Sequence, residues 1–386
     1  MPPSKHALLS ASSAKRWMTC TPSARWEATL PDSDSPFAAE GTVAHALAEE
    51  MLTCWLNRRA FIAADSETIK NNASIYSSSM NVYVHDYVEK VTAAFEQYAL
   101  AGKEPRMYLE QKVNFSQWVP EGFGTSDVVI VADNVLHIID LKYGKGVPVD
   151  AEGNPQLRCY ALGAYQAFKA LEDFDTVTME IIQPRLDSDT VETLALDDLL
   201  IWAAEELRPK AEMAYRGEGL FHPTDEACRF CKGRNQCRYN AAKQLELGRI
   251  EGGKGPEMSP TEIAGVLERV DSLTKWASGL KEWALEQAVN HGAAFPGFKL
   301  VTGRSNRIIS DKNEAVAKLE AAGYGPDQTC TLLGLSDLEK IVGKKQLADV
   351  LDDLIIKPDG KPTLVKDSDK RPALDLSAQY NDYFKE

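Results

Sequence analysis

The sequence predicts an α/β protein whose mixed central sheet is flanked by helices. The first observation is the stretch FGTSDVVIVADNVLHIIDLKYG (Phe123 to Gly144), in which two short apolar strands are joined at Asp133-Asn134. The second is strand-like alternation on either side, at residues 108–113 and 176–183. The third is a helical segment between the hairpin and the last of these strands. An order of helix, three strands, helix and strand is typical of an α/β core.

The hairpin also predicts a functional site. Asp133-Asn134 tolerates the positive φ of a tight turn, so the two residues that flank it are expected to pair. Counting back along the antiparallel ladder places Asp127 directly opposite Asp140, and Lys142 projects from the same face two residues later. Two facing carboxylates repel each other and need a proton or a cation between them. A divalent metal with oxygen ligands would meet that need.

One predicted helix precedes this hairpin in the sequence and another follows it. The first begins near position 41 and reads VAHALAEEMLTCWLNRR, with His45 and Glu49 four residues apart on one face. A histidine on such a mostly apolar helix is either a structural residue or a ligand. The second helix starts at Asn154-Pro155, because Asn is a good N-cap and Pro suits the first helical position. It places Gln156 and Tyr160 on one face.

Three cysteines stand close together in ACRFCKGRNQC, at CxxC-x5-C spacing. A CxxC turn lets two thiolates converge on one metal, so this segment is expected to hold a metal or a cluster. One ligand is then missing, and the cysteine in RWMTCTP is the candidate for it. Spacing alone does not separate zinc from an iron–sulfur cluster. The expected ligands are Cys228, Cys231 and Cys237, with Cys20 either the fourth ligand or a small core residue, whereas Cys159 and Cys330 are expected to be core residues.

Composition limits the classes of function. The chain has 386 residues, with 44% hydrophobic content and a formal net charge of -14. That charge argues against non-specific nucleic-acid binding by the whole surface, although it allows a local basic groove. No apolar run approaches the ~20 residues that span a bilayer. The N-terminus lacks the apolar core of a secretory signal, so a cytoplasmic location and no membrane association are expected.

The chain is expected to divide at a linker. Residues 1–245 would form the core with the cysteine cluster, and residues 246–260, which include GRIEGGKGP, would form the linker. Residues 261–386 would form a mainly helical accessory region, beginning with a long helix to about His291. Its role is left open between DNA binding through Arg304 and Arg307, recruitment of a recombination partner, and oligomerisation.

Taken together, these segments resemble the RecB-like branch of the PD-(D/E)xK nuclease superfamily. More narrowly, they are similar to its phage- or prophage-encoded iron–sulfur members, allied to the CRISPR-adaptation exonucleases and the AddB nuclease domain. The likeness covers roughly residues 8 to 240. The motifs that carry it are GTVAHALAE with His45, GTSDVVIV with Asp127, IIDLKYG with Asp140 and Lys142, QLRCY with Gln156 and Tyr160, and the cysteine set.

This resemblance implies a restriction-endonuclease-like core and a metal-dependent DNA exonuclease. It would hydrolyse phosphodiester bonds at single- or double-stranded DNA ends, in phage recombination or replication, within the bacterial host cytoplasm. A phage single-strand annealing or binding protein is the implied protein partner. The alternative is a non-catalytic DNA-binding or regulatory module that keeps the fold and the cluster.

The resemblance also implies roles for individual residues. Mg²⁺ or Mn²⁺ would be held by His45, Asp127, Asp140 and the carbonyl of Leu141. Lys142 would orient or deprotonate the attacking water and stabilise the developing charge. Gln156 and Tyr160 would position Lys142 or contact a phosphate. A [4Fe–4S] cluster on the four cysteines would fasten the N-terminal segment to the end of the core, with zinc as the less favoured occupant.

Overall fold

The computed structural model describes residues 7–31, 36–247, 259–301 and 312–322, together with positions 334, 338, 350 and 351. The expectations for Arg304, Arg307 and Cys330 therefore lie outside the described residues. The chain groups into two units, residues 1–284 and residues 285–386. Part of the predicted linker is also outside the described ranges, so the predicted domain boundary stays a prediction.

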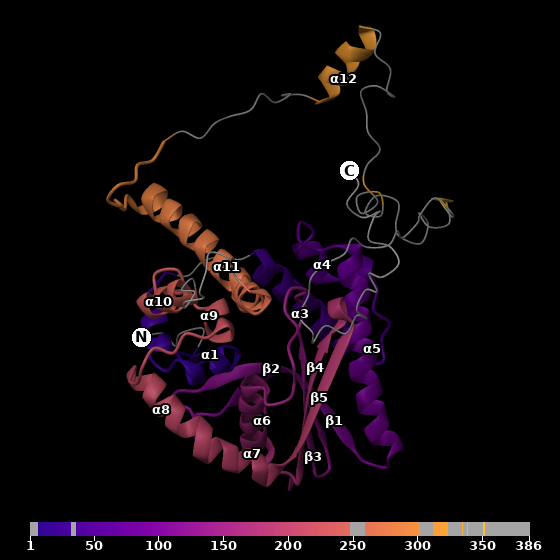
Figure 1. Ribbon diagram of the computed structural model, residues 1–386. Coiled ribbons are helices and arrows are strands. Elements are labelled where there is room, and N and C mark those ends of the chain that lie inside the picture. Colours follow the sequence, from indigo (N-terminus) through magenta and orange to yellow (C-terminus); the bar gives the residue numbers. More distant parts are fainter. Residues whose placement is uncertain are drawn as a thin grey trace. The chain divides into compact units, whose positions relative to one another are not determined.

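A five-stranded mixed sheet forms the centre of the first unit (Figure 1). The strands lie in sequence order, and every neighbouring pair is antiparallel except β3 with β4, which is parallel. The α/β class with a mixed sheet is thus confirmed. The strands are β1 (Pro105–Asn114), β2 (Phe123–Ala132), β3 (Val135–Leu141), β4 (Thr176–Gln183) and β5 (Ser188–Ala195).

The β2–β3 hairpin has the predicted turn and register. Asp133 adopts a φ of 50°, as the tight turn requires, and Ala132 pairs with Val135. The ladder continues through five pairs and ends at Val128 with Ile139. It therefore stops one position before the predicted Asp127–Asp140 pair, although both aspartates lie in the strands that the register brings together.

The parallel β3–β4 pair explains the position of α6 (Pro155–Phe168). Parallel neighbours need a long crossover, and α6 is the helix of that crossover. Its start was predicted correctly: the Asn154 side chain accepts hydrogen bonds from the first-turn N–H groups of Gln156 and Leu157. The crossover carries the chain from the carboxyl end of β3 to the first turns of α6, which is where the site residues meet.

Helices cover both faces of the sheet, with α6 on one face and α3 (Pro36–Leu56) and α5 (Ser78–Leu100) on the other (Figure 1). A hydrophobic core lies on each face of the sheet, and β2 contributes to both because successive side chains point to opposite faces. Val129 and Val131 face the α6 side, while Val128 and Ile130 face the α3 and α5 side. The expectation that the helix carrying His45, which is α3, begins near position 41 was wrong. It begins at Pro36, since Pro is favourable in a first helical turn.

The remaining helices follow the sheet or precede it. From Leu196 to Arg216 the chain is continuously helical, with one π-helical turn before Pro209, whose ring cannot fit a regular α-helical turn. The long helix predicted after Pro260 is confirmed and ends at His291. These elements are η1 (Ala11–Ser13), α1 (Ala14–Thr19), α2 (Ser23–Glu27), η2 (Ala63–Asp65), α4 (Glu67–Asn71), η3 (Pro184–Leu186), α7 (Leu196–Trp202), η4 (Ala203–Leu207), α8 (Arg208–Arg216), α9 (Asp225–Arg229), α10 (Arg238–Leu247), α11 (Pro260–His291) and α12 (Lys312–Ala321).

Two departures from the sequence expectations concern the ends of the fold. The edge strand β5 was not predicted, because its sequence SDTVETLA has polar and apolar residues on both faces and so shows no clear alternation. In the described C-terminal residues the secondary structure is helical, as expected. Within the described ranges, no helix combines the length and apolarity needed to cross a membrane.

Close packing of α6 on β1 predicts a stability effect at Gly163. A Cβ there would lie 2.7 Å from the Cβ of Val113, which belongs to a fixed strand. We expect Gly163→Ala to lower the free energy of unfolding by about 1–3 kcal/mol, because the overlap outweighs the better helix propensity of Ala. Urea denaturation measures it. Gly41→Ala is the matched control: Gly41 is also inside a helix, but a Cβ there meets nothing within 4 Å, so that variant should be no less stable. A Gly163→Ala protein as stable as the wild type would contradict the packing argument.

Candidate functional site

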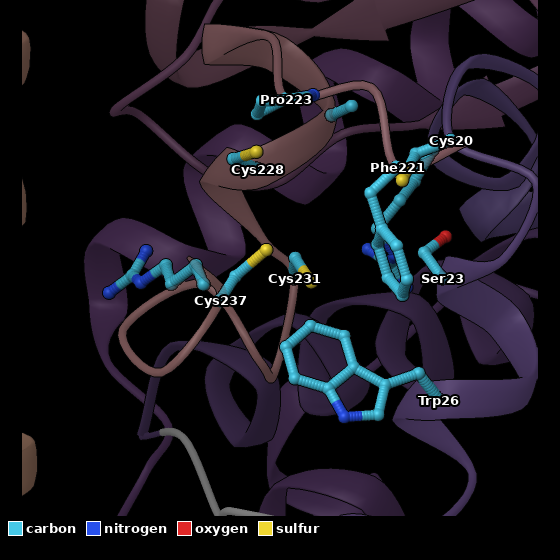
Figure 2. A pocket seen from close by; sticks show the side chains of 11 residues that line it. Cys20, Ser23, Trp26, Phe221, Pro223, Cys228, Cys231 and Cys237 are labelled. Atoms are coloured by element: carbon cyan, nitrogen blue, oxygen red, sulfur yellow. The ribbon is translucent and has the colours of Figure 1, made fainter. Parts of the chain in front are cut away.

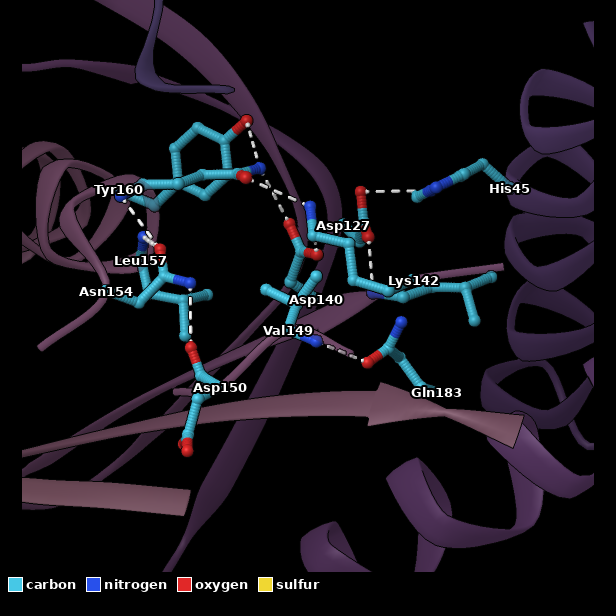
Figure 3. Close-up of polar contacts among 12 residues, drawn as sticks. His45, Asp127, Asp140, Lys142, Val149, Asp150, Asn154, Leu157, Tyr160 and Gln183 are labelled. Atoms are coloured by element: carbon cyan, nitrogen blue, oxygen red, sulfur yellow. Dashed lines mark hydrogen bonds and ion pairs between the residues drawn. The ribbon is translucent and has the colours of Figure 1, made fainter. Parts of the chain in front are cut away.

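The predicted site residues meet at the carboxyl end of β3 (Figure 3). Asp140 and Leu141 end this strand, and Lys142 follows it directly. Gln156 and Tyr160 come from the first turns of α6, on one side. The imidazole of His45 reaches the site from α3, on the other side (Figure 3).

Asp127 connects the two sides. Its Oδ2 accepts a hydrogen bond of 2.8 Å from the backbone N–H of Leu141, at the place where the β2–β3 backbone ladder has just stopped. Its Oδ1 lies 3.2 Å from Nδ1 of His45. The Asp127 carboxylate thus takes the place of a β2 backbone carbonyl as acceptor for a β3 N–H. At the same time it pairs with His45 of α3.

A second network surrounds Asp140, whose side chain is almost completely buried. The Lys142 Nζ lies 2.8 Å from Asp140 Oδ2, an ion pair whose angle falls outside hydrogen-bond geometry, and it donates a 2.9 Å hydrogen bond to Gln156 Oε1. The Gln156 amide nitrogen donates to Asp140 Oδ1 at 3.0 Å and lies 3.3 Å from the Tyr160 hydroxyl. Burial raises the pKa of Asp140, and Lys142 opposes that rise.

Glu110 is a site residue that the sequence reasoning missed. Leu109 pairs with Val128 and Gln111 pairs with Ser126, so the β1–β2 register places Glu110 opposite Asp127, where no backbone pair forms. Glu110 has a φ of 43°, which is strained for a non-glycine residue and is often found at functional sites. The β1–β2 register was the signal that could have identified it.

Three side chains offer ligand atoms that all lie within 4.8 Å of one another: His45, Glu110 and Asp127. Burial alone would lower the pKa of His45, but the Asp127 carboxylate raises it to about 9. Burial and the charge of Asp127 raise the pKa of Glu110 to about 7. Without a cation, protons therefore balance part of the negative charge in this group.

The chemistry of these donors fits a divalent cation. Two carboxylates with one imidazole suit Mn²⁺, and Mg²⁺ also prefers carboxylate oxygens and retained waters. Of the predicted ligands, His45 and Asp127 belong to this convergent group, while Asp140 is occupied by Lys142 and Gln156. The ligand role of the Leu141 carbonyl stays a prediction.

This group lies beside a pocket whose wall extends to α5 (Ser78–Leu100). Besides the three side chains, the pocket is lined by Glu49, which shares a face of α3 with His45, and by Tyr87 of α5. Burial and the charges of Asp127, Asp140 and Glu110 raise the pKa of Tyr87 well above its usual range, so the phenol keeps its proton.

The four predicted cysteine ligands line a second pocket (Figure 2). This pocket holds about 330 Å³ of space not filled by atoms, part of it open to solvent. Cys20 reaches it from the N-terminal segment, and the other three come from the segment around α9 (Asp225–Arg229). Cys159 is instead fully buried in the core, as predicted. Burial raises the pKa of Cys228 to about 11 and that of Cys231 to about 12, so a bound metal would displace their protons.

Protein contacts alone already join these two distant segments. The Glu27 carboxylate accepts hydrogen bonds from Arg16 and from the backbone N–H of Lys232, and the Thr21 hydroxyl donates to the Glu218 carbonyl. The ring of Trp26 fills the space beside Gly233, where an added Cβ would meet it at 2.4 Å. The N-terminal segment is therefore fixed beside the CxxC turn.

The four cysteines line one pocket and could together hold a zinc ion or an iron–sulfur cluster.

A family model matches residues 6–372, which is nearly the whole chain; its description is "Protein of unknown function (DUF2800)". The chain belongs to the DUF2800 family. Among solved structures, one titled "Crystal structure of SSO0001" matches with 13% sequence identity and a TM-score of 0.25, over 59% of this chain and 95% of that chain. At this TM-score the match does not establish a common fold.

The pKa values of His45 and Glu110 predict that divalent cations bind more tightly as the pH rises. A proton on either side chain competes with the ion, and these protons are lost through about pH 7 for Glu110 and about pH 9 for His45. Titration calorimetry with Mn²⁺, in buffers of equal ionic strength, should show the affinity rising across this range. His45→Gln should remove the part of the rise near pH 9. An affinity that does not change with pH would contradict the assignment.

Proposed function

We propose that this protein is a metal-dependent DNA exonuclease that hydrolyses phosphodiester bonds at DNA ends with Mg²⁺ or Mn²⁺. The observation that carries the proposal is the position of Lys142. Its ammonium lies between the Asp140 carboxylate and the Gln156 amide oxygen, and Asp127 and His45 lie across the end of the same strand pair. Carboxylates, a lysine and an imidazole held together in this way are what hydrolysis of a charged phosphodiester requires.

The chemistry assigns a task to each residue. A divalent cation held by His45, Glu110 and Asp127 would polarise the phosphate and lower the pKa of a water. Lys142 orients the attacking water and stabilises the negative charge that develops on the phosphate. Asp140 and Gln156 hold the Lys142 ammonium in place, so its position does not depend on the substrate. Tyr160 supports Gln156 from the next turn of α6.

The same arrangement supports a place in the RecB-like branch of the PD-(D/E)xK nucleases, with a restriction-endonuclease-like core. The motifs that resemble this branch come from α3, β2, β3 and α6, and their side chains contact one another in the fold. By the same resemblance, the protein acts in the bacterial host cytoplasm in phage recombination or replication, with a phage single-strand annealing or binding protein as partner.

The cysteine pocket supports a [4Fe–4S] cluster with a structural role. Its ligands would be Cys20, Cys228, Cys231 and Cys237, which all line the pocket. The contact between Cys20 Sγ and the backbone N–H of His222 already closes a loop of 202 residues. A cluster would make that closure permanent, which restricts the unfolded chain and so stabilises the fold.

Cleavage of end-labelled DNA tests the activity. With Mg²⁺ or Mn²⁺, the wild type should shorten single- or double-stranded DNA, and labels at the 5′ or the 3′ end report the polarity. Lys142→Ala should reduce the rate about 10²–10⁴-fold, because it removes the group that orients the water. Lys145→Ala is the matched control, since this lysine is exposed three residues further on. DNA binding without metal-dependent cleavage would favour the non-catalytic module instead.

Metal analysis tests the cluster. Protein purified without oxygen should be brown and contain about four iron atoms per chain. Cys20→Ser should lose the iron and the visible absorbance. Cys54→Ser should keep both, because Cys54 lies on α3 and does not line the pocket. Stoichiometric zinc in place of iron would contradict the proposal.

A further inference from the structure

The hydroxyl of Tyr87 is a buried polar group without a partner. The side chain is 1% exposed, and no hydrogen bond to its oxygen forms within the described residues. A buried hydroxyl left unpaired is costly, and most buried tyrosines avoid that cost by finding a hydrogen-bond partner. Packing accounts for the ring, which belongs to the core between α3, α5 and the sheet. It does not account for the hydroxyl, since phenylalanine would fill the same space.

The surroundings of Tyr87 indicate what the hydroxyl meets. Tyr87 lines the pocket that also contains His45, Glu110 and Asp127. In the described part of the chain, no hydrogen bond or ion pair to the Glu110 carboxylate forms either. A phenolic donor and a carboxylate acceptor, both without hydrogen-bond partners, therefore face one pocket at the convergent ligand group.

We propose that Tyr87 is a positioning residue for the ion site. When a divalent cation is bound, its hydroxyl donates a hydrogen bond to the ionised Glu110 carboxylate and so holds Glu110 as a third protein ligand beside His45 and Asp127. Carboxylates that bind metals are commonly hydrogen-bonded from behind in this way. The inference rests on the ion site of the proposed function, and it does not depend on DNA as the substrate.

This arrangement gives α5 a share in the site. Glu110 already has a strained backbone φ of 43°. A hydrogen-bond donor on α5 would also restrict the rotamers of its side chain. The arrangement also gives the phenol hydroxyl a role at a position where an aromatic ring alone would fill the core.

Mn²⁺ binding in the absence of DNA tests the proposal. Tyr87→Phe should bind Mn²⁺ about 10-fold more weakly than the wild type, a loss typical of outer-shell substitutions. Without metal, this variant should be at least as stable as the wild type, because it removes an unpaired hydroxyl. Tyr98→Phe is the matched control: it lies about three turns further along the same helix, where its hydroxyl contacts His137, and should leave the affinity unchanged.

A double-mutant cycle separates positioning from packing. In a Glu110→Gln background, Tyr87→Phe should have little further effect, since its action runs through the carboxylate. Wild-type affinity in Tyr87→Phe, or an equal loss in both backgrounds, would overturn the inference. If Tyr87→Phe fails to fold, packing does require the hydroxyl and the inference also fails. Mn²⁺ binding as expected, without DNA cleavage, would overturn only the proposed nuclease; a wild type that binds no Mn²⁺ would overturn the inference whatever the DNA assay shows.

Discussion

The carboxylate of Asp127 is the interaction on which the rest of the site depends. One oxygen takes the Leu141 N–H just beyond the last backbone pair of β2 and β3, and the other faces His45. A backbone donor that would otherwise be buried without a partner is thereby satisfied. Because a side chain serves as that partner, the end of the ladder is also the point at which α3 contacts the acidic site.

The site can contain several carboxylates because each is balanced in a different way. Asp140 forms an ion pair with the Lys142 ammonium, and Asp127 pairs with His45. Burial and the charge of Asp127 raise the pKa of Glu110, so this carboxylate is balanced by a proton when no cation is bound. Removing charges from water is costly unless each finds a partner of opposite sign or a proton.

Local sequence rules predicted those parts of the fold that depend on near neighbours. The turn at Asp133-Asn134, the cap at Asn154 and the long helix up to His291 each follow from a few adjacent residues. The same rules predicted that Asp140 and Lys142 would lie near Asp127, since the hairpin register is local, whereas the place of Gln156 beside them came from the family resemblance. The cysteine set needed the family resemblance as well, because no local rule connects Cys20 to the CxxC turn.

The features that the sequence did not predict depend on contacts between segments that are far apart along the chain. Glu110 enters the site through the register of β1 on β2 and through a backbone angle that propensities do not favour. The Tyr87 hydroxyl reaches the site because α5 packs on the same face of the sheet as α3. The edge strand β5 has polar and apolar residues on both of its faces, so its pairing with β4 had little hydrophobic signal in the sequence. Such features follow from the assembled sheet and cannot be derived from any single segment.

The docking of the N-terminal segment has a consequence for synthesis of the chain. Arg16, Thr21 and Glu27 find their partners among residues 218–232, so the first residues made remain without their final contacts while about two hundred more are translated. The sheet and α6 can form in that interval, since their pairings are short in sequence. The first helices can pack on α6 in the same interval, whereas their hydrogen bonds to residues 218–232 are among the last contacts to form. A ribosome stalled before the CxxC turn would carry a nearly finished sheet whose first helices still lack their hydrogen bonds to residues 218–232.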